Sequence, residues 1–565
     1  MTVDTNHHFV GIDVGTGSAR AGVFDEAGRL LASVAHDIDQ FRYPGDLAEQ
    51  SSENIWDCVC KSVTAALKRS GIVASDVKGI GFDATCSLVV LDKDEQPLTV
   101  SATGENAQNI IVWMDHRAIT QADRINATNH RVLDYVGGCI SPEMETPKLL
   151  WLKEQMPETY HGAGHFFDLT DFLTWRATGD RSRSVCTVTC KWTYLAHEKS
   201  WDKSYFKAIG LEELIDDNFA RIGQSIVDAG TPLGSGLSPK AASEFGLQAG
   251  TPVGAGLIDA HAGGLGTVGA EGSSQCAQDR MAYVFGTSAC TMSSSKEQAF
   301  VPGVWGPYYS AMVPGLWLSE GGQSAAGEAI AQLVRFHPAY DAANSKAAET
   351  DQNLLSYLLE QIAEMVDEPS EAILLAKEKV VVPEFLGNRA PFADPNAKAI
   401  ISGLDTDITI SSLIGLYVAG IAGLGYGLRQ ILHVQAKNSV KPKLVVISGG
   451  AGEHPIVKQL LADAAGIPIA ESGSAEPVLL GSAMLGAVAS GHKTSVTQAM
   501  KEMSSLGHIY TPAARHQQRH TLCFQAFEAL QSSALLAREA THDVLGRSAP
   551  PLDGDQTKHE EREEE

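Results

Sequence analysis

Two aspartates, Asp13 and Asp259, each end an apolar segment directly before glycine-rich backbone. An ionised carboxylate only accepts hydrogen bonds, so it can take a proton from a hydroxyl or face a hydrated Mg²⁺ ion. Glycine-rich backbone can approach a phosphate closely and surround it with N–H groups. These features favour phosphoryl transfer, with Asp13 beside the metal. Alternatively, Asp259 caps the helix that follows it, and its neighbour His261 is expected to be a structural histidine.

The glycine loop after the first aspartate, Gly15 to Ser18, lacks the Gly-Lys-Ser/Thr ending of a Walker loop. Residues 19–38 alternate small or apolar with polar positions and contain a turn signal at residues 25–28. This pattern predicts strand, turn and strand rather than a helix. A loop between antiparallel strands can still bind phosphate, although a glycine-rich hairpin without any chemical role has the same pattern.

A similar pattern returns about half a chain later. Residues 283–292, YVFGTSACTM, repeat the order of residues 10–18: an apolar strand, then Gly-Thr and a small hydroxyl residue. The repeat indicates one old duplication rather than a solenoid. Residues 443–469 predict a strand, a glycine-rich loop, a helix, a glycine stop and a strand. The loop SGGAGEHP, residues 448–455, fits nucleotide binding at a helix N-terminus, or a fragment of a dinucleotide loop.

The elements that position these loops belong to a large chain. A length of 565 residues predicts two large domains with a ligand cleft between them, and Asp259 lies near their junction. Strand-like and helix-like segments alternate, which indicates a mixed α/β protein. The longest apolar stretch, residues 413–432, is rich in glycine and carries Arg429, so we expect a buried helix rather than a membrane span.

Composition excludes some functions. The formal net charge of −25 argues against a nucleic-acid partner, which would require clustered positive charge. The nine cysteines form no CxxC pair and no cluster with zinc spacing, as expected for reduced thiols in a cytoplasmic protein. We find no secretory signal pattern at the start. Residues 545–565 are acidic and without core residues, so we expect a disordered tail.

Five motifs occur in a characteristic order: GIDVGTGSAR, VGAGLIDAHAGG, FGTSACTM, FLGNRAPFADPNAKAIISGL and SGGAGEHP. In this order they resemble the FGGY carbohydrate kinases, from about residue 9 to about residue 530. The resemblance implies two actin-like, ribonuclease-H-like ATPase domains, residues 9–262 and 263–530, with a cleft between them. The segments GFDATCSLVV and SVCTVTCKWTYL are most similar to D-ribulokinase-like members of the ribulokinase branch.

The resemblance implies that Asp259 is the general base, which takes the proton of a sugar hydroxyl as that hydroxyl attacks the γ-phosphate of ATP. Asp13 is expected to organise Mg²⁺ together with Asp259. The implied ATP contacts are Gly15, Thr16, Gly17 and Ser18 in the first hairpin, Gly286, Thr287 and Ser288 in the second loop, and Gln323, Gly449, Gly450 and Ala451 on the adenosine side.

The implied sugar contacts are Ala84, Thr85, Cys86, Asp115, Lys191, Asp259 and Glu320. Carboxylates and a lysine suit an open-chain ketopentose, which is a row of hydroxyls and a carbonyl. Four of these contacts have a structural alternative. Lys191 could be a surface lysine that lies over aromatic rings, and Asp115 could form an ion pair with Arg117. Glu320 could cap the next helix, and the Cys86 sulfur could be only a small buried apolar group.

Two positions depart from the family pattern. Gly452-Glu453-His454 stands where many relatives have a Lys-Asn pair, which leaves the adenine contacts open. Thr291 stands where D-ribulokinase-like members often have histidine, so the substrate preference is less firmly implied than kinase activity.

The resemblance therefore predicts a cytoplasmic, Mg²⁺-dependent enzyme that transfers the γ-phosphate of ATP to the terminal hydroxyl of D-ribulose, giving D-ribulose 5-phosphate. L-ribulose, ribitol and D-xylulose are the alternative substrates. A nicotinamide-dependent dehydrogenase is disfavoured because the first loop opens a strand meander. A non-catalytic actin-like ATPase would leave the acids and the lysine of the sugar site without a purpose. We expect no membrane partner, and the resemblance implies a homodimer.

Overall fold

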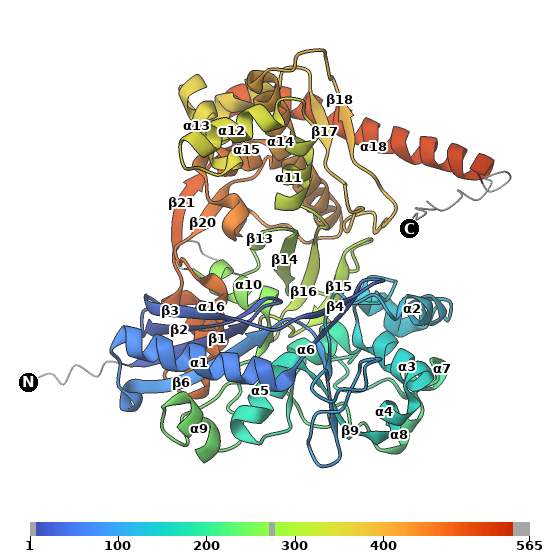
Figure 1. The fold of residues 1–565 in the computed structure, drawn as a ribbon, viewed down its shortest axis with the longest axis vertical. Helices are drawn as coiled ribbons and strands as arrows, with labels where there is room; N and C mark the ends of the chain where they lie inside the picture. Colours follow the sequence, from blue (N-terminus) through green and yellow to red (C-terminus); the bar gives the residue numbers. More distant parts are fainter. Residues whose placement is uncertain (1–6, 271–276, 546–565) are drawn as a thin grey trace, which may run out of the picture.

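A computed structural model describes the backbone of residues 7–270 and 277–545. Figure 1 shows a lower body that begins with the N-terminal strands and an upper body built mainly from later helices. The strands are β1 (His8–Val14), β2 (Ser18–Asp25), β3 (Leu30–Asp37), β4 (Phe41–Tyr43), β5 (Leu47–Gln50), β6 (Val77–Ala84), β7 (Leu88–Asp92), β8 (Ile110–Ile111), β9 (Ala163–Asp168), β10 (Arg183–Ser184), β11 (Ile226–Val227), β12 (Leu257–Ile258), β13 (Arg280–Phe285), β14 (Ala289–Ser295), β15 (Trp305–Tyr309), β16 (Trp317–Gln323), β17 (Val380–Val382), β18 (Ile400–Ser402), β19 (Leu444–Ser448), β20 (Ile469–Ser472) and β21 (Leu506–Tyr510).

The helices connect and cover these strands. They are α1 (Ser52–Ser70), α2 (Ile119–Asn126), α3 (Glu145–Gln155), α4 (Pro157–Gly162), α5 (Leu169–Thr178), α6 (Val185–Lys191), α7 (Lys203–Ala208), α8 (Glu213–Asp216), α9 (Pro239–Phe245), α10 (Asp259–Val268), α11 (Gly327–Arg335), α12 (Tyr340–Glu349), α13 (Leu354–Met365), α14 (Ile410–Lys437), α15 (Pro455–Ala465), α16 (Pro477–Ala489), α17 (Val496–Met503) and α18 (Gln517–Leu545). Five short 3₁₀ turns are η1 (Ala74–Asp76), η2 (Arg131–Val136), η3 (Pro369–Ala376), η4 (Gly450–Gly452) and η5 (Ala514–His516).

The two main sheets share one topology. In the first, the strand order is β3-β2-β1-β6-β12, with β1 antiparallel to β2 and parallel to β6. In the second, the order β16-β14-β13-β19-β20 repeats the same directions, and β15 and β21 extend its two edges. The predicted strands after the first glycine loop are therefore confirmed as β2 and β3, and the internal repeat is confirmed as a duplicated topology.

The chain returns to the lower body late in the sequence. Helix α16 packs against β1, β6 and α10, and α17 packs against α16 and α10. Glycines on the two strands make room for α16, because a Cβ at Gly11 would meet the carbonyl oxygen of Leu479 at 1.9 Å, and one at Gly81 that of Ser482 at 1.9 Å. Within residues 477–503 of the predicted C-terminal domain, α16 thus packs against the N-terminal sheet and α10, and α17 packs against α16 and α10.

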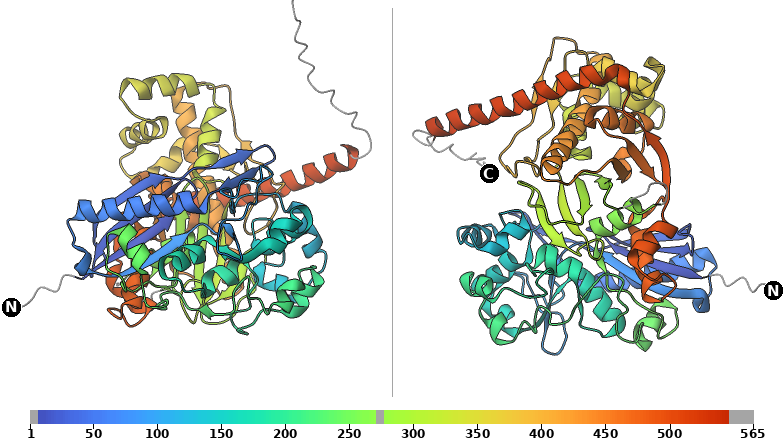
Figure 2. Two further views of the ribbon diagram at one scale, coloured as in Figure 1. Left: turned by 60° about the horizontal axis from the view of Figure 1, so that its bottom comes forward. Right: turned by 180° about the vertical axis from the view of Figure 1, so that it is seen from behind.

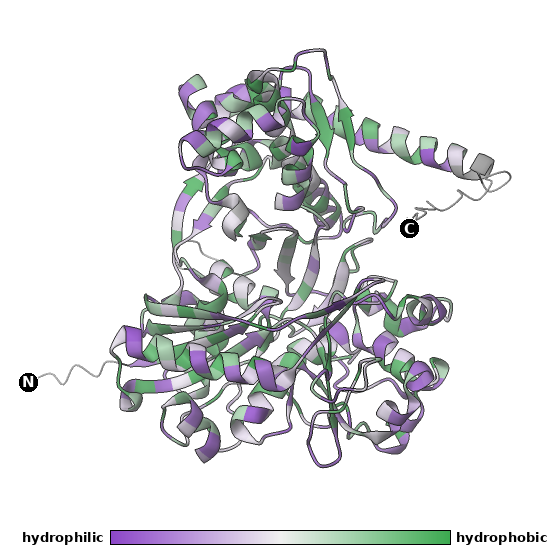
Figure 3. Cartoon of the chain, in the orientation of Figure 1, coloured by the Kyte–Doolittle hydropathy of each residue, from purple (hydrophilic) through white to green (hydrophobic). Residues whose placement is uncertain are grey.

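The apolar stretch of the sequence is the core helix α14. It is the one helix of the described residues that is long and apolar enough to cross a membrane, and 83% of its most apolar window is buried inside the protein. The predicted buried helix is therefore confirmed. In Figure 3, hydrophobic residues are concentrated in the central strands, whereas the peripheral helices carry both hydrophilic and hydrophobic residues.

Helix α18 ends the described part of the chain. Both views in Figure 2 show its C-terminal end extending away from the upper body. The predicted acidic tail, residues 545–565, lies outside the described residues apart from Leu545, the last residue of α18.

Candidate active site

One pocket, with a volume of about 270 Å³, collects side chains from both sheets. Its lining residues include Asp13, Gly15, Thr16, Arg20, Thr85, Cys86, Trp113, Glu143, Lys191, Asp259, Ser288, Cys290, Trp305, Glu320 and Arg389. The pocket therefore brings together both glycine hairpins, the two aspartates that follow apolar strands, and several of the residues predicted to bind sugar.

The first glycine hairpin is held rigidly at one side of this pocket. The amide of Gly15 donates to the carbonyl of Ser18 at 3.0 Å, which closes the turn between β1 and β2. Thr16 accepts a hydrogen bond from Gln50 Nε2 on its carbonyl at 2.8 Å and from Trp113 Nε1 on its hydroxyl at 3.0 Å. The hairpin is thus anchored by side chains from two other segments, whereas a plain surface turn needs no such support.

Charged groups gather at the base of this hairpin. Asp13 pairs with Arg20 across β1 and β2 and with Asp83 across β1 and β6. The Arg20 Nε donates to Asp13 Oδ2 at 2.8 Å, and its Nη1 donates to Glu476 Oε2 at 3.0 Å. Burial and the neighbouring Asp13 raise the pKa of Asp83 well above its usual value, although the Ser482 hydroxyl donates to it at 2.5 Å. One guanidinium thus bridges Asp13, which lines the pocket, and Glu476, which does not.

Asp259 is the first residue of α10 and lines the same pocket as Asp13. The N-cap position belongs to Ile258, and the Asp259 Oδ1 accepts only the next amide, that of Ala260, at 2.7 Å. Burial, and then the charge of Asp13, raise the pKa of Asp259 to about 6. The carboxylates of Asp13 and Asp259 face one pocket, and this oxygen donor set fits a hard cation such as Mg²⁺.

Two cations of the pocket lining lie near one indole. Lys191 is buried, and its Nζ lies 5.1 Å from the centre of the Trp305 ring, while the Arg389 guanidinium lies 5.6 Å from the same ring. The surface alternative for Lys191 is therefore wrong. Glu320 lies within β16 and pairs with Met292, whereas α11 begins at residue 327. The capping alternative for Glu320 is wrong as well.

Some of the predicted sugar contacts at the end of β6 line the pocket and one does not. Thr85 and Cys86 line it, and the Thr85 amide donates to the carbonyl of Val14 at 2.9 Å, which ties this segment to the first hairpin. Ala84 ends β6 opposite Val14 and is not among the lining residues. Burial raises the pKa of the Cys86 thiol, so its sulfur remains a neutral, apolar contact in the pocket wall.

Asp115 does not reach the pocket lining. Its Oδ2 accepts the amide of Ala48 at 2.7 Å, and both of its oxygens accept from the Arg117 side chain at 2.8 Å. The Arg117 Nη2 also donates a hydrogen bond to Glu49 Oε1 at 2.8 Å. Because Asp115 is fully buried in this network, the structure favours the ion-pair alternative over a direct sugar contact.

The predicted second phosphate loop and the glycines predicted to contact adenosine follow β13 and β19, and their strand ends lie side by side because these strands are parallel neighbours. The Gly286 amide donates to the carbonyl of Ser288 at 2.9 Å, and Ser288 lines the pocket. Gly449 has a φ of 96°, and a Cβ there would lie 2.6 Å from the carbonyl oxygen of Phe285. Gly450 and Ala451 follow in η4, and Thr287 accepts the Ala326 amide at 2.8 Å.

The side chain of Gln323 makes two hydrogen bonds within the upper body. Its Oε1 accepts from the Tyr283 hydroxyl at 2.6 Å, and its Nε2 donates to the carbonyl of Leu424 at 2.9 Å. Of the remaining predicted ATP contacts, Gly17 and Ser18 complete the first hairpin without lining the pocket. Gln323 therefore braces the sheet beside the second loop in this arrangement.

The two departures from the family pattern have local roles. The His454 Nδ1 accepts the amide of Ile456 at 3.2 Å and so caps α15. Thr291 lies buried on β14, with its hydroxyl oxygen 3.1 Å from the position a Cβ on Gly321 would take. Neither residue lines the pocket.

The sequence analysis did not assign several lining residues to the site, among them Arg20, Trp113, Glu143, Trp305 and Arg389. A signal existed for Arg20, because a short turn at 15–17 pairs residue 13 with residue 20 across the hairpin. Arg389 lies inside the motif FLGNRAPFADP, but nothing local distinguishes it from a surface arginine.

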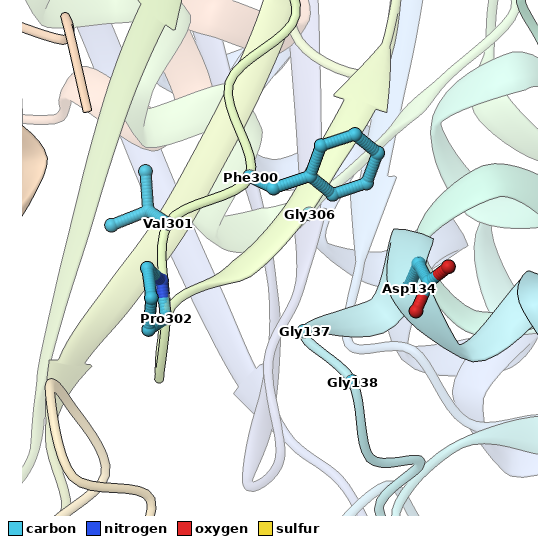
Figure 4. Close-up of a pocket in the computed structure, with 7 residues that line it drawn as sticks. All are labelled: Asp134, Gly137, Gly138, Phe300, Val301, Pro302 and Gly306. Carbon is cyan, nitrogen blue, oxygen red and sulfur yellow. The ribbon is translucent and has the colours of Figure 1, made fainter. Parts of the chain in front are cut away.

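A second cavity, of about 290 Å³, lies beside Trp305. Figure 4 shows Asp134 and the glycines 137 and 138 on one side of it, facing the segment 300–302. Asp134 is its one titratable lining residue, which is too little for acid–base catalysis. Gly137 has a φ of 84°, and a Cβ there would lie 3.1 Å from Trp305 Cδ1. This glycine turn therefore supports the indole of the first pocket.

Two sheets of one topology, each with a glycine hairpin at a shared pocket, define the two-domain, ribonuclease-H-like ATPase fold of the actin type. Family models for the N-terminal and C-terminal domains of the FGGY family of carbohydrate kinases match residues 8–266 and 281–490. The chain belongs to this family and is a carbohydrate kinase of the FGGY type. Kinases of this family use ATP, usually with Mg²⁺.

Relatives and solved structures agree with this assignment. The chain is 43% identical over 528 residues to an FGGY carbohydrate kinase domain-containing protein of Homo sapiens, covering 92% of this chain and 95% of that protein. It is 37% identical over 512 residues to a D-ribulokinase of Saccharomyces cerevisiae, covering 85% of this chain and 72% of that protein.

The fold resembles ligand-bound xylulose kinase from Lactobacillus acidophilus, with a TM-score of 0.76 and 18% identity over 93% of this chain and 98% of that one. It also resembles Plasmodium falciparum glycerol kinase with ADP, with a TM-score of 0.71 and 16% identity over 93% of this chain and 98% of that one. At these identities, the two structures support the fold.

Proposed function

We propose that the protein transfers the γ-phosphate of ATP to the terminal hydroxyl of D-ribulose, with Asp259 as the general base. The observation that carries this proposal is the position of Asp259, whose pocket holds the two glycine hairpins as well as Lys191 and Glu320. The identity to a D-ribulokinase supports the choice of sugar.

In this mechanism, the Asp259 oxygen that is not bonded to Ala260 accepts the proton of the sugar's terminal hydroxyl. The hydroxyl oxygen forms the new bond to the γ-phosphorus, the bond from that phosphorus to the bridging oxygen breaks, and ADP leaves. The raised pKa of Asp259 suits this task, because a base of higher pKa takes a proton more readily.

The phosphates are proposed to lie along the first hairpin and the turn at 286–288. Glycine backbone allows close approach, and Arg20 supplies a positive charge beside them. Asp13 and Asp259 would hold Mg²⁺, which when bound neutralises phosphate charge. Gly449, Gly450 and Ala451 are proposed to contact adenosine, because their turn lies next to the second loop.

The sugar is proposed to lie between the phosphate end and Trp305. Lys191 and Arg389 donate hydrogen bonds to its oxygen atoms, and Glu320 accepts one from a hydroxyl. Thr85 and Cys86 form the wall that limits the length of the chain. Sugar binding would exclude water from Asp259 and so limit wasteful hydrolysis of ATP.

The test is ADP release with Mg·ATP across D-ribulose, L-ribulose, D-xylulose, ribitol and glycerol. We expect a strong preference for D-ribulose, and a loss of roughly 10²–10⁴-fold in kcat in Asp259→Asn. The control is Asp202→Asn, at the cap of α7 and outside the pocket, which should keep its activity. Preference for another sugar would reject D-ribulose as the substrate and identify that sugar in its place. ATP turnover unaffected by every sugar would reject the kinase mechanism and favour a non-catalytic actin-like ATPase.

A further inference from the structure

A buried row of three side chains lies behind the sugar side of the pocket. Cys186 on α6 contacts His261 on α10, with 3.0 Å between Sγ and Nδ1. His261 in turn contacts Glu320 on β16, with 3.2 Å between Nε2 and Oε2. Cys186 and His261 are 0% exposed and Glu320 is 6% exposed. Three elements distant in the sequence thus meet in one hydrogen-bonded chain that ends at the pocket.

The direction of the second hydrogen bond follows from the donor inventory. An ionised carboxylate only accepts, so the proton between His261 and Glu320 belongs to Nε2 of the imidazole. The other ring nitrogen then either accepts from the Cys186 thiol or donates to its thiolate. In both cases Cys186 satisfies Nδ1, and the imidazole presents an N–H to Glu320.

This arrangement leaves one Glu320 oxygen for the substrate. Oε2 is occupied by His261, whereas Oε1 takes no hydrogen bond from the described residues, and the side chain lines the pocket. A carboxylate fixed through one oxygen loses less rotational freedom when a sugar hydroxyl binds to the other.

Cys186 also supports the general-base side of the site. Its Sγ lies 3.4 Å from the amide nitrogen of Ile258, which directly precedes Asp259. One thiol therefore contacts both the entry into α10 and the imidazole two residues beyond Asp259.

We infer that His261, oriented by Cys186, is a positioning residue that holds the Glu320 carboxylate in place for one sugar hydroxyl. This inference rests on the proposed function of the pocket. The alternative is that His261 has only a structural role and packs in the protein core.

A metal site on the same residues is the rival explanation. The Cys190 sulfur joins Cys186 and His261 with ligand atoms within 4.8 Å of one another. Structural zinc sites take four ligands, and no fourth cysteine, histidine or carboxylate joins this group within the described residues. The observations therefore favour a hydrogen-bonded chain over a zinc centre.

The test compares His261→Leu, which removes the donor, with His261→Gln, whose amide can still donate to Glu320. We expect His261→Leu to raise the KM for the sugar about tenfold while the KM for ATP changes less than twofold. His261→Gln should recover most of the sugar KM. Equal effects on both substrates, or a glutamine variant no better than leucine, would overturn the inference.

Two substitutions of Cys186 change fewer atoms than those of His261, so they test the same inference with less disturbance of folding. Cys186→Ala removes the partner of Nδ1, whereas Cys186→Ser keeps a hydroxyl there, so the sugar KM should rise more in the alanine variant. In a Glu320→Gln background, His261→Leu should have little further effect on the sugar KM, because the two residues act as one unit. Additive effects would contradict the inference.

Two outcomes separate this inference from the proposed function. A wild-type protein without sugar-dependent ADP release rejects the proposed function and the positioning role together. An active wild type whose variants fail the comparisons above rejects the positioning role alone. One equivalent of zinc in the purified wild type, absent from Cys190→Ala, would replace the hydrogen-bonded chain with a metal centre.

Discussion

Arg20 joins the first glycine hairpin to a helix from the far end of the chain. Its Nε donates to Asp13 Oδ2 at 2.8 Å, and its Nη1 donates to Oε2 of Glu476, the N-cap residue of α16, at 3.0 Å. The guanidinium therefore offsets the charge of two carboxylates next to the hairpin that we propose to bind phosphate.

Removing this cation should weaken the use of ATP. We expect Arg20→Gln to lower kcat/KM for ATP roughly tenfold or more, because uncompensated carboxylates would then repel the phosphates. Steady-state kinetics with varied ATP measures this. Arg29→Gln is the matched control, since Arg29 forms an exposed pair with Asp25 just beyond β2. Similar losses in both variants would contradict a local role for Arg20.

Asp115 should matter for stability rather than for the sugar. Breaking its buried pair with Arg117 is expected to cost about 3 kcal/mol of unfolding free energy in Asp115→Asn, because the buried Arg117 charge then keeps only Glu49 as a carboxylate partner within the described residues. Denaturant titration measures the loss, and the KM for the sugar should stay within about twofold. A large rise in that KM at unchanged stability would contradict this prediction and indicate that Asp115 contacts the sugar.

Gly449 and Gly466 offer a matched test of close backbone approach. Both have positive φ, but a Cβ at Gly449 would lie 2.6 Å from the Phe285 oxygen, whereas nothing lies within 4 Å at Gly466. Gly466→Ala should cost about 1 kcal/mol through its backbone conformation alone. Gly449→Ala should cost more and also raise the KM for ATP, because the turn beside the second loop must move. Equal behaviour of the two variants in thermal unfolding and kinetics would refute this.

The carboxyl group of Asp171 should make stability depend on pH. Its oxygens accept from the Ser184 amide at 2.8 Å and the Thr187 hydroxyl at 2.7 Å, at the start of α6. Burial raises the pKa of Asp171 from 3.8 to about 6, with Arg183 opposing the shift and Cys186 adding to it. Between these two values the unfolded chain has released a proton that the folded chain still binds, so stability falls as the pH rises.

The asparagine variant isolates this effect, because Asp171→Asn keeps the shape and does not titrate. From pH 4 to pH 6, the wild type should lose about 2 kcal/mol of unfolding free energy relative to the variant, and roughly 0.4 kcal/mol more between pH 6 and pH 7.5. Denaturant midpoints at pH 4.5, 6 and 7.5 measure the difference. A difference that grows in favour of the wild type as the pH rises would reverse the sign and reject the prediction.

Much of the fold was predictable because its signals are local. The glycine turns at 15–18 and 286–288, the alternation within β2 and the glycine stop at 466 each depend on residues close in sequence. The return of α16 to the first sheet was not predictable, because it depends on glycines more than 390 residues earlier.

The sequence by itself determined the two hairpins, the buried helix α14 and the chemistry available at Asp13 and Asp259, since residue type and short-range spacing carry that information. Only the tertiary structure decided that Asp115 pairs inside the protein, that Lys191 is buried, and that Cys186, His261 and Glu320 form one chain across 75 and 59 residues. Each of these outcomes depends on which faces pack together, and packing is decided by contacts between segments that no local pattern records.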